Sequence, residues 1–343
     1  MRGDRPLAVL AAVVAGALVV GACSGDEEPE AAPASTPTPT PYTTCPLTGE
    51  DPARRVDLAR PAVSIKVENS PQARPQSGLE EADVVFEEIV EGGITRFLVI
   101  FHCHDSKRVG PVRSARFDDP KIAKLFTRVL AFSGANAIVL RELADQKMVW
   151  VEENTSSGAL FRVPPGTLDI HNLFGDTTRL RRLDRAKKAD GPTSGFFEFG
   201  RVPKGARKAR SVRVNFTASN TIEYRWRKGA WRRYEAGSPF TTKRGGQIAV
   251  PNVLIQEVRV DRSARIVDSA GNPSPDIDWL GGGRAFLFRN GKVIRGSWDA
   301  KKRGAVIVFA TRRGDPFVFD KGATWVELVP SRQGQVKGSI SFR

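Results

Sequence analysis

Residues 68–101 read ENSPQARPQSGLEEADVVFEEIVEGGITRFLVIF, and residues 108–116 read RVGPVRSAR. Two β-type runs, 84–90 and 95–101, flank a Glu-Gly-Gly that is typical of a hairpin turn. Prolines at positions 71 and 75 predict an extended loop before the hairpin. We therefore expect a hairpin with a proline-rich loop on one side and an arginine-bearing turn on the other.

Strand and helix signals alternate on both sides of this hairpin, between residues 46 and 200. The apolar run 62–67 predicts a strand, and Asp119 followed by Pro120 predicts a helix that runs to residue 126. Further predicted elements are a strand at 129–132, a helix at 137–146, a strand at 148–151 and a basic helix at 177–188 capped by Asp176. This alternation predicts an α/β (α+β) N-terminal domain with a mixed sheet.

Residues 205–330 instead carry strand signals at short spacing, with Gly, Asn and Pro between them. The predicted strands are 212–216, 222–226, 247–250, 253–260, 284–288, 293–298, 305–309, 316–319 and 324–329. Asn290-Gly291 is a typical hairpin turn pair. We expect a β-rich C-terminal domain of sandwich or barrel type, followed by a tail at 331–343.

Tryptophans are concentrated in this second region. They are Trp226, Trp231, Trp279, Trp298 and Trp325. Two interpretations are open, a carbohydrate-stacking surface or packing in the core and at its rim, and we favour packing because large aromatic side chains usually fill cores.

The N-terminus predicts export and lipidation. Residues 1–22 have a basic start and an apolar run at 7–20, which is typical of a signal peptide and too short for a membrane-spanning helix. The sequence Val-Gly-Ala-Cys ending at Cys23 is typical of a bacterial lipobox, and the competing interpretation is an uncleaved anchor with an incidental cysteine. Residues 23–45 then form a Pro/Thr-rich linker, and roughly twenty extended residues would reach about 60 Å.

The chain is strongly basic, with a formal net charge of +15 and a pI near 10.1. In a cytoplasmic protein this charge would suggest nucleic acid. Export argues against that partner. We expect the protein on the extracytoplasmic face of the cell membrane, with its charge facing anionic lipid headgroups or cell-wall polymers.

Two cysteines remain once Cys23 is lipidated. Cys45 and Cys103 either form a disulfide, as an oxidising compartment permits, or stay unpaired thiols. His102, Cys103 and His104 do not predict a metal site, because successive strand residues point to opposite faces. We expect no metal and no cofactor.

The arginines of the opening stretch are the main candidates for binding. Arg113 and Arg116 are three residues apart, so on a helical turn both reach one anion. Arginine suits phosphate because its planar guanidinium binds two oxygens at once. The competing interpretation is that these arginines pair with nearby carboxylates, namely Asp83, Glu87, Glu91, Asp118 or Asp119. Phosphate-binding glycine loops and serine hydrolase motifs are not found in the sequence.

Five short sequence motifs of this chain resemble those of the YerB family of bacterial lipoproteins. They are KVENSPQARPQSGLEEADVVFEEIVEGGITRFLVIF, RVGPVRSAR, DIHNLF, GGGRAFLFRNGKVIRGSW and GATWVELVP. The resemblance implies two domains and a lipid-anchored surface protein with no assigned enzymatic activity. The pair His171-Asn172 matches the family motif, although Ile170 stands where the family commonly has proline.

A fainter similarity links the first domain to LytR-CpsA-Psr proteins, which transfer glycopolymers from a polyprenyl pyrophosphate carrier. Asp83 opens a strand as in that layout, whereas Ser114 stands where the pattern has aspartate. The similarity implies a Mg²⁺-assisted phosphotransferase, with Arg96, Arg113 and Arg116 on the pyrophosphate and Asp83 on the metal.

Two functions are therefore expected. The favoured one is a non-enzymatic envelope lipoprotein that binds an anionic cell-wall polymer, a polyprenyl phosphate or an envelope protein, and the alternative is the phosphotransferase. The candidate ligand-binding residues are Asn69, Arg74, Asp83, Arg96, Arg113, Ser114, Arg116, His171 and Asn172.

Overall fold

The computed structural model describes residues 42–53, 56–191, 196–268, 271–300 and 307–343. The predicted signal peptide, Cys23 and the linker up to residue 41 lie outside the described residues. Within the described ranges, no helix is long and apolar enough to cross a membrane.

The N-terminal region supplies five strands of a central sheet: β1 (Val63–Glu68), β2 (Val84–Ile89), β3 (Thr95–Phe101), β4 (Val129–Ala131) and β5 (Val149–Val151). β1 pairs antiparallel with β3, and β3 pairs antiparallel with β2. β4 lies parallel to β1, and β5 lies parallel to β4. The predicted hairpin and the mixed sheet are both confirmed.

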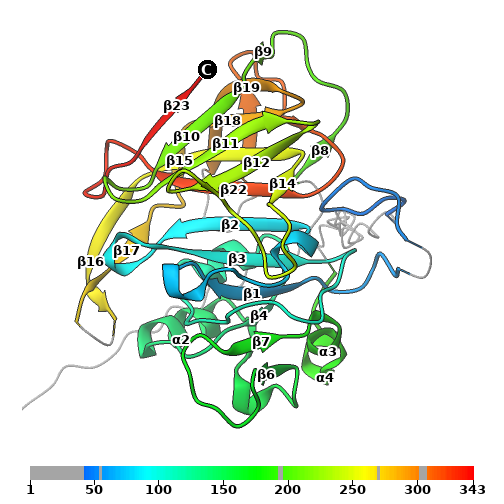
Figure 1. The fold of residues 1–343 in the computed structure, drawn as a ribbon, viewed down its shortest axis with the longest axis vertical. Helices are drawn as coiled ribbons and strands as arrows, with labels where there is room; N and C mark the ends of the chain where they lie inside the picture. Colours follow the sequence, from blue (N-terminus) through cyan, green and yellow to red (C-terminus); the bar gives the residue numbers. More distant parts are fainter. Residues whose placement is uncertain (1–41, 54–55, 192–195, 269–270, 301–306) are drawn as a thin grey trace, which may run out of the picture. The chain divides into compact units, whose positions relative to one another are not determined.

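The C-terminal region supplies the other strands of the same sheet: β9 (Arg207–Lys208), β15 (Asn252–Val258), β18 (Gly281–Arg289), β19 (Lys292–Ala300), β20 (Val308–Thr311) and β22 (Thr324–Pro330). The order across the sheet is β20-β19-β18-β15-β22-β2-β3-β1-β4-β5, with β9 paired to β19 (Figure 1). The sheet therefore continues from one predicted domain into the other.

The junction between the two regions is a parallel pair of buried strands. β2 pairs with β22 from Val84↔Thr324 to Glu87↔Glu327, and every residue of both strands is buried. The domain boundaries expected from the sequence therefore separate segments of chain that share one sheet.

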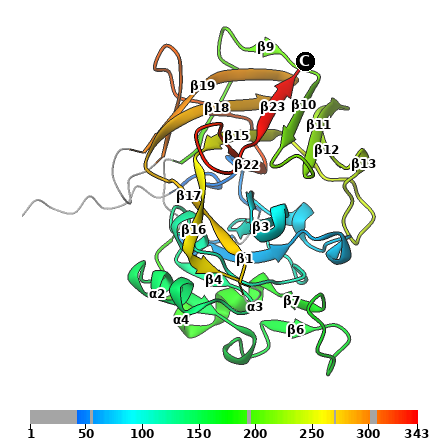
Figure 2. The ribbon, with the colours of Figure 1, turned by 90° about the vertical axis from the view of Figure 1, so that its left-hand side faces the viewer.

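A second sheet of six strands covers one face of the central sheet. Its strands are β10 (Ser211–Asn215), β11 (Thr221–Arg227), β12 (Ala230–Glu235), β13 (Ser238–Pro239), β14 (Ala249–Val250) and β23 (Ser339–Phe342). β23 lies in the segment expected to be a tail and pairs with β10. The β-rich C-terminal region is confirmed, and Figure 2 shows its strands beside the central sheet.

The core between the two sheets is aromatic. Trp231 lies 5.5 Å from Phe288 and Trp325 lies 5.4 Å from Phe97, measured between ring centroids. Both tryptophans are at most 1% exposed, and Trp298, in the core on the opposite face of the central sheet, is 2% exposed. These three tryptophans therefore pack inside the protein and are not available for stacking on a carbohydrate.

The opposite face of the central sheet carries two short helices, α1 (Asp119–Ala123) and α2 (Ala137–Asp145). The side chain of Asn136 caps α2 by accepting a hydrogen bond from the amide of Val139 at 2.9 Å. Phe86 and Phe126 pack under these helices in a core separate from the one that contains Val85. The two cores follow from strand geometry, because successive residues of β2 point to opposite faces.

Smaller elements complete the fold. They are β6 (Leu160–Arg162), β7 (Leu173–Gly175), α3 (Thr177–Arg182), α4 (Asp184–Lys187), β8 (Glu198–Phe199), β16 (Val260–Val267), β17 (Pro273–Ile277) and β21 (Val318–Phe319), with 3-10 turns at Pro71–Ala73, Leu79–Glu81, Glu91–Gly93 and Glu153–Thr155. The prediction of one helix over 177–188 was wrong in detail. Leu183 adopts an extended conformation that divides it into α3 and α4, and its side chain packs against the core.

Candidate functional site

Three arginines, Arg96, Arg113 and Arg116, lie together on the α1 side of the central sheet, and we call them the arginine cluster. The antiparallel registers place Arg96 opposite Glu68 of β1 and opposite Glu88 of β2. The turn that carries the other two arginines crosses this end of the sheet.

Backbone contacts hold that turn in place. The amide of Arg113 donates to the carbonyl of Lys66 at 2.9 Å, and Val112 forms a β-bridge with Val67. One Nη of Arg96 donates to the carbonyl of Ser114 at 3.0 Å. Ser114 therefore contributes its backbone to the cluster.

Two of the three arginines are paired with glutamates. Arg113 Nε lies 3.1 Å from a carboxylate oxygen of Glu68, and Arg116 donates from Nε to Glu91 at 2.7 Å. Although burial opposes it, the charge of Arg116 lowers the pKa of Glu91. The carboxylate-pairing interpretation is therefore correct for Glu91, while the partner of Arg113 is Glu68, which the sequence did not point to.

Arg96 differs from both neighbours. Arg96 is only 5% exposed, and among the described residues its Nε has neither a hydrogen-bond partner nor an ion-pair partner, whereas the Nε of Arg113 has Glu68 as an ion-pair partner. Within the described part of the chain, no carboxylate oxygen lies within the 4.0 Å that defines an ion pair with this guanidinium. Burial, followed by repulsion from Arg116 and Arg113, lowers the pKa of Arg96 to about 10, so the group is still charged at neutral pH.

Glu68 connects the cluster to His171. The Nδ1 of His171 lies 2.9 Å from Glu68 Oε2, the oxygen that also contacts Arg113. Asn172 does not reach the arginines: it accepts a hydrogen bond from Arg162 at 2.7 Å and donates to the carbonyl of Thr167 at 3.1 Å. Of the motif pair, His171 therefore contacts the arginine cluster through Glu68, whereas Asn172 holds a neighbouring loop in place.

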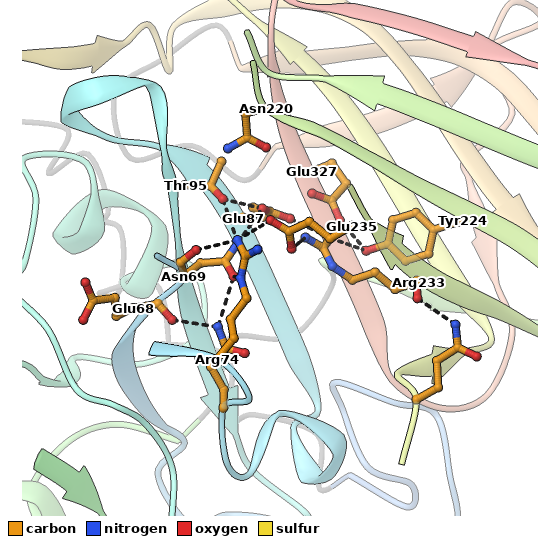
Figure 3. Close-up of polar contacts among 12 residues, drawn as sticks. Glu68, Asn69, Arg74, Glu87, Thr95, Asn220, Tyr224, Arg233, Glu235 and Glu327 are labelled. Atoms are coloured by element: carbon orange, nitrogen blue, oxygen red, sulfur yellow. Dashed lines mark hydrogen bonds and ion pairs between the residues drawn. The ribbon is translucent and has the colours of Figure 1, made fainter. Parts of the chain in front are cut away.

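Asn69 and Arg74 lie on the other face of the sheet, in a buried polar network (Figure 3). Asn69 donates to Thr95 at 2.9 Å and accepts from Arg74 Nε at 3.1 Å. Arg74 also forms an ion pair with Glu235 of β12. These two predicted residues therefore link the proline-rich loop to the second sheet and do not contact the arginine cluster.

Arg233 is the centre of this network, and the sequence did not predict it. Its guanidinium, which is fully buried, lies 2.7 Å from Glu87, 3.3 Å from Glu235 and 3.4 Å from Glu327. It also lies over the ring of Phe240, 4.7 Å from the centroid. The network therefore joins β12 of the second sheet to β2 and β22 of the central sheet.

The network holds more carboxylates than guanidinium groups. Among the described residues, the cations that pair with Glu87, Glu235 and Glu327 are Arg74 and Arg233. Burial, followed by the charge of Glu87, raises the pKa of Glu327 well above its usual range. This shift favours the neutral form of Glu327, which accepts a hydrogen bond from Tyr224 at 2.5 Å.

A second buried ionic cluster lies beside Arg96. Lys66 donates to Glu88 and, at 2.7 Å, to Asp119, and all three side chains are at most 2% exposed. Burial raises the pKa of Glu88 to about 8 against the opposing attraction of Lys66. Glu88 is therefore mostly protonated at pH 7 and does not neutralise the arginine cluster.

Asp83 is far from the arginine cluster. It precedes β2 and lies five residues from Glu88, which stands opposite Arg96 in the strand register, and five residues span roughly 16 Å along a strand. Asp83 instead accepts a hydrogen bond from His104 Nδ1 at 2.7 Å, and that bond raises the pKa of His104. The LytR-CpsA-Psr similarity implies that Asp83 and the arginine cluster share one Mg²⁺ and pyrophosphate site. The structure does not place these residues together.

Cys45 and Cys103 form a disulfide next to Asp83, with their Cα atoms 5.9 Å apart. Of the two interpretations left open by the sequence, the disulfide is the one observed. Among the described residues, no group of three or more His, Cys, Asp and Glu side chains has the arrangement of a metal site.

The fold and the site define a class: an α/β protein whose mixed sheet continues into a β-rich C-terminal region, with a buried arginine cluster on one face. The family model described as "Protein of unknown function (DUF3048) N-terminal domain" matches residues 47–191, and its C-terminal counterpart matches residues 212–326. The chain belongs to this DUF3048 family, which confirms the resemblance to YerB-like proteins.

Two relatives show how far the similarity extends. The chain is 31% identical over 293 residues to "Putative lipoprotein YerB" of Bacillus subtilis (strain 168), covering 83% of this chain and 86% of the relative. It also matches a crystal structure of YerB protein from Bacillus subtilis with a TM-score of 0.72 and 29% identity, covering 86% of this chain and 98% of the other. None of these descriptions names a phosphotransferase.

Proposed function

We propose that this protein is a non-enzymatic lipoprotein, held by Cys23 on the extracytoplasmic face of the cell membrane, that binds an anionic envelope ligand at the arginine cluster. The anchor is supported by the lipobox of the sequence and by the description of the relative as a lipoprotein. The Cys45–Cys103 disulfide supports export, since disulfides persist in oxidising compartments.

The observation that carries the ligand proposal is Arg96. A buried charge is costly unless another group neutralises it. Among the described residues Arg96 has only the Ser114 carbonyl as a hydrogen-bond partner. Arg116 and Arg113 repel it, and the two glutamates that attract it, Glu91 and Glu68, are each paired with one of those arginines. An anion bound here would neutralise Arg96 and would fill the hydrogen-bonding capacity of its Nε.

The cluster is accessible to a ligand from solvent. The side chains of Arg113 and Arg116 are 23% and 18% exposed, although both are held by glutamates. A phosphate group suits this arrangement, because guanidinium groups bind its oxygens in pairs. We propose a phosphate-bearing ligand, either an anionic cell-wall polymer or a polyprenyl phosphate, and no cofactor.

An envelope protein is the competing partner. Arg113 and Arg116 each paired with a glutamate would suit a protein-binding surface, but Arg96 is too deeply buried to contact another protein directly. The phosphotransferase is less well supported than either, because Asp83 lies at the other end of the hairpin and Glu88 and Asp119 are occupied by Lys66.

Binding is tested with the whole protein, extracted from membranes in detergent. Inorganic pyrophosphate and a polyprenyl phosphate in mixed micelles are titrated by calorimetry against the wild type, Arg96→Gln and the control Arg259→Gln. Arg259 is a matched control because it forms an exposed ion pair with Asp261 at 2.8 Å. We expect Arg96→Gln to weaken binding at least about tenfold, since charged hydrogen bonds contribute about 1.5–3 kcal/mol each.

Thermal unfolding first establishes that Arg96→Gln and the wild type are both folded. Equal ligand affinity of the two proteins would then show that the arginine cluster is not the ligand site. Turnover of a lipid-linked glycopolymer with Mg²⁺ would instead contradict the non-enzymatic part of the proposal.

Anchoring has a separate test. Cys23→Ala removes the sulfur that would carry the lipid, so we expect the protein to leave the membrane fraction after cell fractionation. A Ser24→Ala variant is the control and should remain with the membrane. Membrane retention of Cys23→Ala equal to that of the wild type would count against lipidation.

A further inference from the structure

The loop that joins β6 to β7 presents two large apolar side chains to solvent. Leu168 is 91% exposed and Ile170 is 61% exposed, the highest values among the large apolar residues of the described ranges. All residues from 164 to 170 are exposed. We call residues 163–170 the tip loop.

The tip loop is held in place by hydrogen bonds at its base. Arg162 donates to the carbonyl of Asp169 at 2.8 Å, and Asn172 donates to the carbonyl of Thr167 at 3.1 Å. Arg162 is itself fixed by two hydrogen bonds to Glu153, at 2.7 and 2.6 Å. The apolar side chains of Leu168 and Ile170 are therefore exposed by a braced loop.

A cavity of about 820 Å³ lies beside the tip loop. Its lining includes Pro165, Thr167 and Leu168 of the tip loop together with Lys107 and Arg179. Its carboxylates have partners already: Glu153 bonds to Arg162, and Asp176 caps α3 by accepting from the amide of Arg179 at 3.0 Å. The cavity therefore combines apolar walls with cations.

The surface next to the cavity is basic. Residues 176–188 contain six basic and two acidic side chains. Arg179 has a side chain that is 62% exposed and lies 3.5 Å from Asp176, whereas Lys107 and Arg182 are exposed without a carboxylate partner among the described residues. β6, β7, α3 and α4 lie together at one end of the central sheet in both views (Figures 1 and 2).

We propose that the tip loop docks onto an anionic lipid bilayer. Leu168 and Ile170 enter the headgroup region, while Lys107, Arg179 and Arg182 contact anionic headgroups. Exposed apolar side chains beside basic residues are the combination that binds anionic membranes. A protein partner fits less well, because stable protein interfaces bury about 800 Å² on each side and the exposed apolar surface here is two side chains on one loop.

The proposal rests on the extracytoplasmic location of the proposed function but does not depend on the arginine cluster. It is tested with the full chain carrying Cys23→Ala, so that a lipid anchor contributes nothing. Partitioning is measured by cosedimentation with vesicles of phosphatidylglycerol and phosphatidylcholine, and with vesicles of phosphatidylcholine alone. We expect binding to the anionic vesicles and at least about tenfold weaker binding to the neutral ones at low salt.

The decisive variant is Leu168→Ser with Ile170→Ser, in the Cys23→Ala background. Because both side chains are exposed, we expect the fold to tolerate the change and partitioning to fall about tenfold or more, since each buried methylene adds to membrane affinity. Val308→Ser is the matched control: Val308 is 56% exposed on β20, at the far edge of the central sheet. Its partitioning should stay within about twofold of the parent.

A second variant tests the charges. Arg179→Glu with Arg182→Glu should weaken binding to anionic vesicles about tenfold or more and leave the weak binding to neutral vesicles unchanged, because each cation near the surface contributes separately. Equal binding of parent and the Leu168/Ile170 variant would overturn the proposal, as would a parent that binds no vesicle. Loss of vesicle binding in Arg96→Gln alone would also overturn it and would assign the lipid headgroup to the arginine cluster.

Discussion

Buried cations of this protein differ in how they are neutralised. Arg233 on β12 is surrounded by carboxylates, Lys66 on β1 contacts Glu88 and Asp119, and Arg96 on β3 has no carboxylate within ion-pair distance among the described residues. Burying an ion costs several kcal/mol unless it is paired. This difference between buried cations is why we propose Arg96 as a ligand site.

Glu88 makes stability depend on pH. Its pKa is raised from 4.5 to about 8 in the folded protein, so the folded state keeps a proton that the unfolded chain loses. The contribution of Glu88 to the free energy of unfolding is therefore fully present below pH 4.5. This contribution falls by up to about 1.4 kcal/mol per pH unit as the pH rises toward 8. Glutamine does not titrate, so we expect the stability of Glu88→Gln to fall less steeply than that of the wild type between pH 5 and pH 8.

The measurement is urea unfolding of the wild type and Glu88→Gln at pH 5, 6, 7 and 8. Glu198→Gln, an exposed glutamate of β8, serves as the control and should follow the wild type. A constant stability difference between Glu88→Gln and the wild type across these pH values would show that Glu88 does not titrate in this window.

At the scale of elements, the Arg233 network decides how the second sheet is attached. β12 carries Arg233 and Glu235, β2 carries Glu87, and β22 carries Glu327. Trp231 and Trp325 add hydrophobic packing between the two sheets. The ionic contacts add a second constraint on register, because a shift of β12 by one residue would turn Arg233 away from Glu87 and Glu327.

We expect Arg233→Met to reduce the free energy of unfolding by about 3–5 kcal/mol, because it leaves buried carboxylates without a cation. Glu327→Gln should cost less than about 1 kcal/mol, since burial favours the neutral form of Glu327 and glutamine preserves its shape. Chemical denaturation measures both values.

Arg225→Met is the matched control for Arg233→Met. Arg225 lies on the neighbouring β11 and pairs with Glu223 at 2.8 Å, but its side chain is 35% exposed. Surface pairs of this kind contribute about 0–1 kcal/mol. If Arg233→Met were no more damaging than Arg225→Met, the network would not be what holds the sheets together.

The elements themselves were predicted well where the pattern is strong. β2, β3, β4, α2 and β22 lie where apolar runs and capping residues indicated. β12 was missed because its sequence AWRRYE carries charged residues that resemble an exposed segment, yet Arg233 is fully buried. β6, β7, β16 and β17 were also missed, since short strands with mixed composition give little local signal.

At the scale of the whole molecule, the position of β22 decides the folding unit. β22 lies between β15 and β2, so the N-terminal strands depend on a strand more than 220 residues later in the chain. A fragment ending at residue 205 would leave the buried edge of β2 unpaired. Unpaired, apolar strand edges favour aggregation over folding.

We therefore expect fragment 42–205 alone to lack cooperative unfolding and dispersed amide NMR signals. Adding fragment 206–343 should restore both, because it supplies β22. The whole chain 42–343 is the control. Cooperative unfolding of fragment 42–205 by itself would show that the N-terminal region is an independent domain, as the family boundaries suggest.

The sequence by itself determined the fold class, the predicted lipobox, the central hairpin and the family, because apolar periodicity, turn residues and motif words act over a few neighbouring positions. It also pointed to Arg96, Arg113 and Arg116, which the structure brings together. Only the tertiary structure decided that Asp83 stands apart, that Asn69 and Arg74 serve the opposite face, and that Arg233 meets Glu87 and Glu327. These contacts join residues far apart in the chain, so they depend on how distant strands pair and how the two sheets pack together, which no short stretch of sequence encodes.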